Sequence, residues 1–278
     1  MTDRDFRFGV VAGLADSGAQ WTGTARRAEE LGYDILLVPD TVHTFAPFPA
    51  LAAAAATTLR LRVGTYVLSA PNRSPGLVAW ESRSLHALTD GRFELGLGGG
   101  RPGAERDAAQ LGADFGTPAD RLRRVADTIR AVRAPDGSAP PVLVAASRPR
   151  MLRLAAEQAD IVALGLRPHA TEDELARTVA TLRALAGDRT PELHLNVAAV
   201  AEHARAVPPE LGRILGGDPQ AMAAAGGIGF LLGTPDEIAE VLRRRRAELG
   251  ITYVAVNGMF LERFAPVVAL LRKATALP

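Results

Sequence analysis

The segment RFELGLGGGRPG, residues 92–103, decides between two α/β folds for this chain. Gly98, Gly100 and Gly103 match G-x-G-x-x-G, the spacing of the turn that binds dinucleotides in a Rossmann sheet. In that fold the motif follows the first strand and opens a long helix. Here it follows the fourth apolar segment, Pro102 interrupts it, and the next residues, AERDAAQLGADFG, are too broken for a long helix. The position of the motif therefore disfavours a Rossmann fold.

Eight short apolar segments alternate with amphipathic stretches along the 278 residues. Apolar and β-branched runs predict strands, whereas apolar residues at helical spacing predict helices. A (β/α)₈ barrel needs about 250 residues, so this rhythm predicts an α/β fold with one TIM-barrel domain over residues 1–278. The loop-like stretch 133–140 lies between the fourth and fifth units and predicts no domain boundary. The expected strands are 7–13, 33–39, 61–68, 92–98, 141–146, 160–166, 193–200 and 251–256.

Composition excludes several function classes. The formal net charge is +1, from 32 basic and 31 acidic residues, which disfavours a nucleic-acid partner. The chain has no cysteine, so disulfides, thiolate catalysis and cysteine-based zinc sites are excluded. The five histidines lack ligand spacing, so we expect no metal site. No apolar run approaches the roughly 20 residues that span a bilayer, and the N-terminus does not resemble a signal peptide. These features predict a cytoplasmic protein without a membrane partner.

Three segments resemble the luciferase-like monooxygenase superfamily, especially its single-chain oxidoreductases that use the deazaflavin coenzyme F420. The resemblance covers nearly the whole chain in matching order, and LTDGRFELGLGGG is its most specific part. It implies the same (β/α)₈ barrel, F420 or FMN at the C-terminal mouth, hydride transfer with a small-molecule substrate, and a homodimer. The segments are PFPALAAAAATTLRLRVGTYVL (47–68), LHALTDGRFELGLGGG (85–100) and GTPDEIAEVLRRRRAELGITYVAV (233–256).

The end of the second expected strand carries VPDTVH. The resemblance implies an Asp-His pair here, with the imidazole beside the reactive ring. Asp40 is present, but Thr41 takes the histidine position and His43 is the nearest imidazole. A histidine titrates near neutral pH and could donate a proton to a substrate. An ordinary loop histidine is the alternative.

The end of the third expected strand carries SAPNRSP. The resemblance implies a non-proline cis peptide under the central ring of the cofactor, with Leu68, Ser69 and Ala70 at the matching positions. Asn72 and Arg73, in the following turn, are expected to contact substrate or cofactor. An ordinary turn at this proline-asparagine pair is the alternative.

After the fourth strand, Gly98, Gly99 and Gly100 match the cofactor loop of the family. Members that use F420 often carry an acid directly after this loop, where a carboxylate can take part in proton transfer. Arg101 occupies that position in this chain, and Glu105 is the nearest acid. Arg101 would suit a phosphate or carboxylate ligand, or be a solvated loop charge.

After the fifth strand, the family usually has glycines that grip the cofactor phosphate at a helix N-terminus. This chain has Ala145, Ala146, Ser147 and Arg148. The hydroxyl and the arginine still favour an anion, while the alanine methyl groups crowd close backbone approach. A capped helix with surface arginines is the alternative.

The leading hypothesis is thus an F420- or FMN-dependent oxidoreductase, in which Asp40, His43, Asn72 and Glu105 make polar contacts or transfer protons. The departures at Thr41, at Arg101 and at the alanine pair 145–146 favour a second hypothesis. In it, the barrel has lost its cofactor and catalyses an isomerisation or cyclisation in a biosynthetic pathway. A third is a non-catalytic relative that binds flavin.

Overall fold

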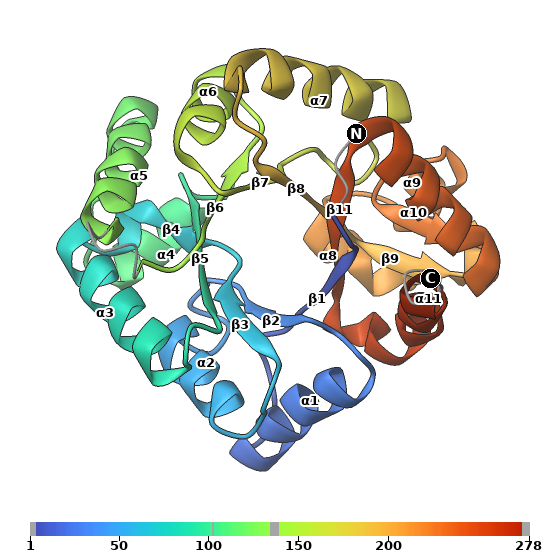
Figure 1. Cartoon of the computed structure of the whole chain (residues 1–278), viewed down its shortest axis with the longest axis horizontal. Helices are drawn as coiled ribbons and strands as arrows, with labels where there is room; N and C mark the ends of the chain where they lie inside the picture. The colour runs from blue at the N-terminus through green and yellow to red at the C-terminus, as the bar shows by residue number, and fades with distance from the viewer. Residues whose placement is uncertain (1–3, 102, 134–138, 274–278) are drawn as a thin grey trace.

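Eight parallel strands close into a barrel ringed by helices in the computed structural model, which describes residues 4–101, 103–133 and 139–273 (Figure 1). The pairing of β3 with β5 closes the barrel, which confirms the predicted (β/α)₈ fold. Pro102 and most of the loop 133–140 lie outside the described residues. The barrel strands are β1 (Arg7–Val11), β2 (Ile35–Val38), β3 (Arg62–Thr65), β5 (Phe93–Gly98), β6 (Val142–Ala146), β7 (Ile161–Leu164), β8 (Glu192–Val197) and β11 (Ile251–Asn257).

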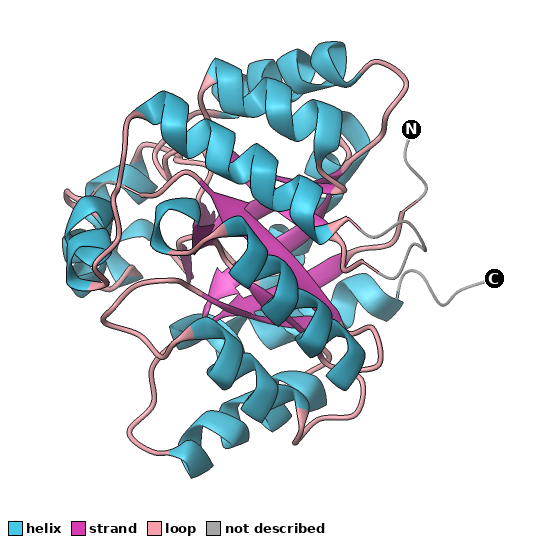
Figure 2. Cartoon of the chain, turned by 90° about the vertical axis from the view of Figure 1, so that its left-hand side faces the viewer, coloured by secondary structure: helices cyan, strands magenta, loops and turns pink. Residues whose placement is uncertain are grey.

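Eight helices form the outer layer around the barrel (Figure 2). Their starts follow from local sequence: the Ser17 side chain caps α1, and Thr117, Thr171 and Thr234 form capping boxes at α5, α7 and α10. The helices are α1 (Gly18–Glu30), α2 (Pro47–Ala55), α3 (Pro75–Leu88), α5 (Pro118–Val132), α6 (Pro149–Gln158), α7 (Glu172–Ala186), α10 (Pro235–Leu249) and α11 (Leu261–Lys273).

Shorter elements decorate the connections between these units. The irregular stretch after β8 contains a two-stranded parallel sheet in which β9 pairs with β10. These elements are β4 (Leu68–Ser69), η1 (Ala70–Asn72), α4 (Ala104–Gln110), β9 (Ala199–Ala201), η2 (Ala204–Ala206), η3 (Pro209–Leu211), α8 (Gly212–Leu215), α9 (Pro219–Ala224), β10 (Phe230–Leu232) and η4 (Gly258–Phe260).

The third barrel strand is broken, and β4 continues it after one extra residue. Gly64 pairs with Glu94 on β5, whereas Leu68 pairs with Leu97, so four steps on one strand face three on the other. The Thr65 side chain bridges the break: its hydroxyl donates to the Gly96 carbonyl at 2.9 Å and accepts from the Gly96 amide at 2.8 Å. A side chain thus replaces the missing backbone pair.

A non-proline cis peptide lies inside this break, between Tyr66 and Val67. The expected location at Leu68, Ser69 and Ala70 was therefore wrong by two residues. The physical reason is strand pairing: the Tyr66 amide still bonds Val38 on β2 at 2.8 Å, and Leu68 and Ser69 are already paired regularly with β5. The chain departs from regular pairing only between these two points.

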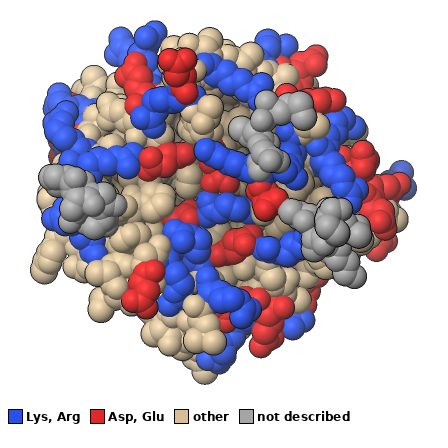
Figure 3. Space-filling model, in the orientation of Figure 1, with Lys and Arg blue, Asp and Glu red and all other residues tan. Residues whose placement is uncertain are grey.

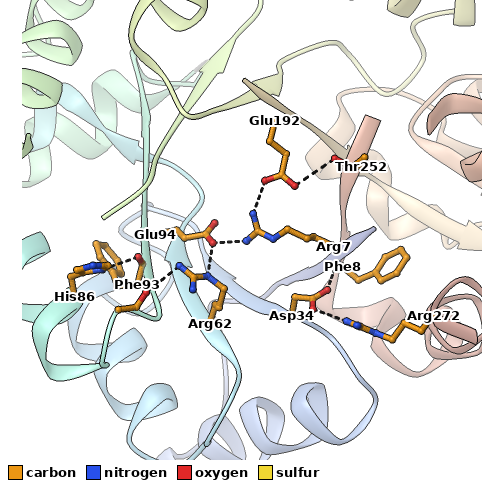
Figure 4. Close-up of polar contacts among 11 residues, drawn as sticks. Arg7, Phe8, Asp34, Arg62, His86, Phe93, Glu94, Glu192, Thr252 and Arg272 are labelled. Carbon is orange, nitrogen blue, oxygen red and sulfur yellow. Dashed lines mark hydrogen bonds and ion pairs between the residues drawn. The ribbon is translucent and has the colours of Figure 1, made fainter. Parts of the chain in front are cut away.

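Charged side chains fill the N-terminal end of the barrel interior (Figure 4), and basic and acidic side chains lie together at the centre of the face that Figure 3 shows. The Glu94 carboxylate pairs with Arg7 and, at 2.6 Å, with Arg62, while Arg7 also reaches Glu192 at 2.6 Å. Both carboxylates are buried. Inward-pointing positions alternate along each strand, so apolar and aromatic side chains form the layers above this network.

Substitution of Gly96 should destabilise the fold. A Cβ on Gly96 would lie 2.0 Å from the Thr65 carbonyl oxygen, so Gly96→Ala must force the two strands apart. We expect a loss of about 3 kcal/mol in the free energy of unfolding, measured by urea denaturation. Gly23→Ala is the control, since a Cβ there meets nothing within 4 Å on helix α1. That variant should gain about 0.5–1 kcal/mol, and an equal effect at both sites would contradict the packing argument.

Candidate functional site

The buried Asp40 carboxylate organises one side of the barrel mouth. Its Oδ2 accepts hydrogen bonds from the Ser69 amide at 2.9 Å and the Asn72 side chain at 3.4 Å, and pairs with the Arg73 guanidinium at 2.6 Å. The structure therefore brings together Asp40, Ser69, Asn72 and Arg73, all of which the sequence singled out. An acceptor held by three donors positions the loop after β4.

Three polar atoms near this carboxylate are buried without a hydrogen-bond partner among the described residues: Ser69 Oγ, Asn72 Oδ1 and Glu81 Oε2. Burial raises the pKa of the Glu81 carboxyl against the opposing charge of Arg73, and the Asp40 carboxylate raises it further. Buried polar groups usually have partners, so these atoms are candidates for contact with a ligand.

His43 and Thr41 lie on a tight turn that follows β2. The Thr44 hydroxyl donates to the Thr41 carbonyl at 2.9 Å, and its amide donates to the same oxygen at 3.1 Å. His43 is exposed on this turn, whereas the Asp40 side chain is only 6% exposed. The two predicted residues therefore occupy different environments.

The glycines that follow β5 have two separate physical roles. A Cβ on Gly98 would lie 2.7 Å from the Val67 side chain, so Gly98, like Gly96, is required by the broken strand. Gly99 and Gly100 instead line a cavity. Gly100 has a φ of +94° and packs against the ring of Phe115, where an added Cβ would come within 2.9 Å.

Arg101 is paired with a buried acid that sequence reasoning missed. Its guanidinium lies 2.6 Å from the Asp107 carboxylate, whose side chain is 4% exposed. Glu105, the predicted acid, is exposed in the first turn of α4. The spacing offered a signal, since Ala104, Asp107 and Ala108 share the buried face of a helix.

A cavity of about 470 Å³ lies between the β5 loop and the N-terminus of α6. Ser147 and Arg148 line it and are exposed, Ala145 also lines it, and the Ala146 side chain is buried. No side chain caps this helix start, and Pro149 occupies its first turn. The first amides of a helix lack intrahelical acceptors and carry the positive end of the helix dipole. The cavity therefore combines backbone donors with positive charge.

Aromatic side chains stack along the barrel axis beneath the mouth. The His194 ring is 4.9 Å from the Tyr66 ring and 4.5 Å from the Tyr253 ring, centroid to centroid. Tyr66 is partly accessible, and Asn196, which follows His194 on the same face of β8, is exposed. Tyr66 and Asn196 therefore reach the mouth from inside the barrel. Sequence reasoning missed both.

His194 is fully buried, and both its ring nitrogens lack a hydrogen-bond partner among the described residues. Burial lowers the pKa of the imidazole to about 3, and the positive charge of Arg7 contributes. The Tyr253 hydroxyl beside it is also buried without a partner in the described part of the chain. His194 is therefore neutral at physiological pH.

A sequence model of the luciferase-like monooxygenase family matches residues 10–207. This chain belongs to the luciferase-like monooxygenase family. The F420-dependent glucose-6-phosphate dehydrogenase of Beutenbergia cavernae is 34% identical over 116 residues, or 38% of this chain and 34% of that enzyme. Matches to curated relatives span between 20% and 56% of those proteins' own lengths. The named relatives are oxidoreductases and monooxygenases.

Solved structures agree with the luciferase-like fold. The coenzyme F420 dependent tetrahydromethanopterin reductase from Methanopyrus kandleri superposes with a TM-score of 0.72 at 16% identity, covering 96% of this chain and 97% of that one. A riboflavin lyase with modified FMN and riboflavin gives a TM-score of 0.75 at 16% identity, covering 99% and 93%. At these identities the likeness supports the barrel architecture alone.

Within residues 4–101, 103–133 and 139–273, no helix is both long and apolar enough to cross a membrane. The same residues contain no group of three or more histidine, aspartate or glutamate side chains that could hold a metal ion.

His194 should make the fold sensitive to acid. Its pKa is near 3 in the folded protein and about 6.5 when unfolded, so only the unfolded state binds this proton between those values. Stability is therefore lost as pH falls below about 6.5. Between pH 7 and pH 5, the free energy of unfolding measured in urea should fall by about 2 kcal/mol less for His194→Phe than for the parent. The exposed His203→Gln should behave like the parent, and identical pH profiles for all three proteins would contradict the assignment.

Proposed function

We propose that this chain is an oxidoreductase that binds F420 or FMN at the mouth of the barrel and transfers hydride between the cofactor ring and a small organic substrate. The observation that carries the proposal is the cavity at α6, where an uncapped helix start meets arginine side chains. Relatives named for F420, and a structural neighbour that holds modified FMN, support the same class of cofactor.

The donors in this cavity suit a phosphate. Arg148 and Arg150 line it, together with the Ser147 hydroxyl, and the amides of the first turn of α6 add further donors. Arg121 lies on the opposite wall, with its guanidinium 4.2 Å above the Phe115 ring. The chemistry of this set fits the phosphate group that FMN and F420 share.

The surroundings of the broken strand suit a flat ring. Val67, from the cis peptide, and Ala145 are partly buried apolar side chains that pack against the buried cluster inside the barrel that includes Tyr253. Tyr66 and, across the barrel on β8, Asn196 add polar groups. A bound F420 or FMN would supply the hydride, and these side chains would orient the ring and exclude water.

The predicted polar residues take different roles in this proposal. Asp40 positions Asn72, whose Oδ1 is then presented without a described partner and can accept a hydrogen bond from substrate. His43, on the exposed turn, is the imidazole that we propose as a proton donor to the substrate. Glu105 is also exposed, so its role would be limited to the rim of the mouth.

Cofactor binding tests this function directly. We expect FMN or F420 to raise the melting temperature and to change the visible absorbance of the ring, with riboflavin binding at least about tenfold more weakly than FMN if FMN is the cofactor. Arg148→Glu should weaken binding of the phosphorylated cofactor by about tenfold, because it places a negative charge in the cavity. Equilibrium titration followed by absorbance measures each affinity.

Arg153→Glu is the matched control, since Arg153 is exposed on the same helix but does not line the cavity. It should keep the affinity of the parent. Equal weakening by both substitutions would place the phosphate elsewhere. If neither FMN nor F420 changes the melting temperature or the visible absorbance, the cofactor proposal is overturned.

The second candidate function is catalysis without a cofactor, such as an isomerisation or cyclisation. Two observations favour it: Asp107 engages Arg101, and the Phe115 ring packs against Gly100 beside the cofactor loop. Both reduce what the loop offers to an anion. Failure of the cofactor titration would favour this candidate.

We also propose a homodimer through the outer faces of α2 and α3, which lie side by side (Figure 1). Leu77, Trp80 and Leu88 form an apolar stripe on α3, with exposures of 40%, 68% and 80%. The exposed positions of α2 are proline and alanine, a smooth surface against which the larger α3 side chains of a second copy can pack. A twofold axis would repeat this contact.

Trp80→Glu should convert the dimer to a monomer, because each interface would then bury two carboxylates beside apolar surface. Light scattering after gel filtration measures the mass. Ile214→Glu is the control, since Ile214 is 75% exposed on α8, away from this stripe. A monomeric parent protein, or dissociation by the control alone, would contradict the assignment.

A further inference from the structure

A groove of about 960 Å³ lies at the N-terminal end of the barrel, remote from the mouth. It runs between the last turns of α7 and α10 and reaches the residues that lead into β8 and β11. Its volume is about twice that of the cavity at α6. The proposed oxidoreductase function does not use this groove.

The groove has an apolar floor and a basic rim. The accessible floor includes Ala186, Pro191 and Ala247, which lie over the buried Leu182 and Leu193. Four arginines line the groove above it: Arg183 on α7, Arg189 after α7, and Arg243 and Arg246 on α10. The guanidinium of Arg4 extends this basic edge, since it donates to the Thr190 carbonyl at 2.9 Å. Glu248 is the carboxylate among the described lining residues.

The arginines exceed what the adjacent helix ends require. Each helix C-terminus carries about half a negative charge, which a basic side chain in the last turn offsets. Two such ends, the Glu248 carboxylate and Glu240, which lies 3.3 Å from Arg243, stand against five guanidinium charges, those of the four lining arginines and Arg4. The groove therefore keeps an excess of about two positive charges, all supplied by side chains.

The run RRRR, residues 243–246, explains part of this charge. A run of four charged residues on a helix predicts a solvated face, and this prediction is wrong for Arg245. That side chain is 4% exposed and lies 2.6 Å from Glu172 on α7. This ion pair joins the two helices that flank the groove. Arg243 and Arg246 line the groove, whereas Arg244 is exposed outside it.

We propose that this groove binds an amphipathic anion, a phosphate monoester attached to a short alkyl chain. The phosphate pairs with the guanidinium groups of the rim, and the alkyl chain covers the apolar floor. The excess of two positive charges matches a phosphate dianion. Since the helix ends here oppose an anion, the affinity depends on the arginines alone.

Octyl phosphate is the probe, measured by isothermal titration calorimetry on the full chain. We expect it to bind at least about tenfold more tightly than inorganic phosphate or octanol, because each of these lacks one half of the contact. The double variant Arg183→Glu with Arg243→Glu should weaken the binding of octyl phosphate by at least about tenfold. Both residues are exposed, so the fold should be retained.

The control is Arg177→Glu with Arg244→Glu, which makes the same charge change on the same two helices at exposed positions outside the groove. It should keep the affinity of the parent. Equal weakening by the two double variants, or equal affinity for inorganic phosphate, would overturn the proposal. So would the absence of saturable binding, or binding that FMN displaces, which would place the probe at the mouth.

Discussion

The close approach of the Thr65 carbonyl to Gly96 is the constraint on which the mouth of this barrel depends. Where a Cβ would stand 2.0 Å from that oxygen, only glycine leaves room for the chain to leave regular pairing. The break that follows contains the cis peptide and turns Val67 onto Gly98. It also restarts the strand at β4, which delivers Ser69 to Asp40. A backbone contact in the wall thus sets the positions of polar groups at the rim.

The two ends of the barrel interior differ in how their buried polar groups are paired. At the N-terminal end, Arg7, Arg62, Glu94 and Glu192 form ion pairs, although Glu94 Oε2 lacks a described partner, and removal of one member of such a pair costs about 3–5 kcal/mol. Towards the mouth, more polar atoms are buried without described partners. His194 lies at the boundary and remains neutral because burial, and then the positive charge of Arg7, lower the pKa of its imidazole. The paired end stabilises the fold, and the unpaired atoms are the ones that we propose for contact with a ligand.

The barrel was predictable because it follows from periodicity and length, which are local properties of the sequence. The position of the candidate site was predictable for a related reason. Asp40, Asn72 and Ser147 lie within three residues of a strand end, and parallel strands end on one face of the barrel. Tyr66, His194 and Asn196 were missed because inward-facing residues in a strand have the same alternating pattern as core residues. Asp107 was missed because its burial depends on the packing of a seven-residue helix. The position of the cis peptide was predicted two residues too late, because a one-residue shift in strand pairing does not alter the composition of the segment.

The glycine loop matches a dinucleotide-binding motif in spacing, but its glycines are required for a different physical reason. In a Rossmann turn, the glycines admit a pyrophosphate; here Gly96 and Gly98 admit the neighbouring strand, and only Gly99 and Gly100 face a cavity. The donors for an anion lie one unit further around the barrel, at the start of α6. Because adjacent strand ends converge at the mouth, the loop and that helix start form the two walls of one cavity. The phosphate site that we propose therefore lies at the junction of two βα units, so the sequence of a single unit does not indicate it.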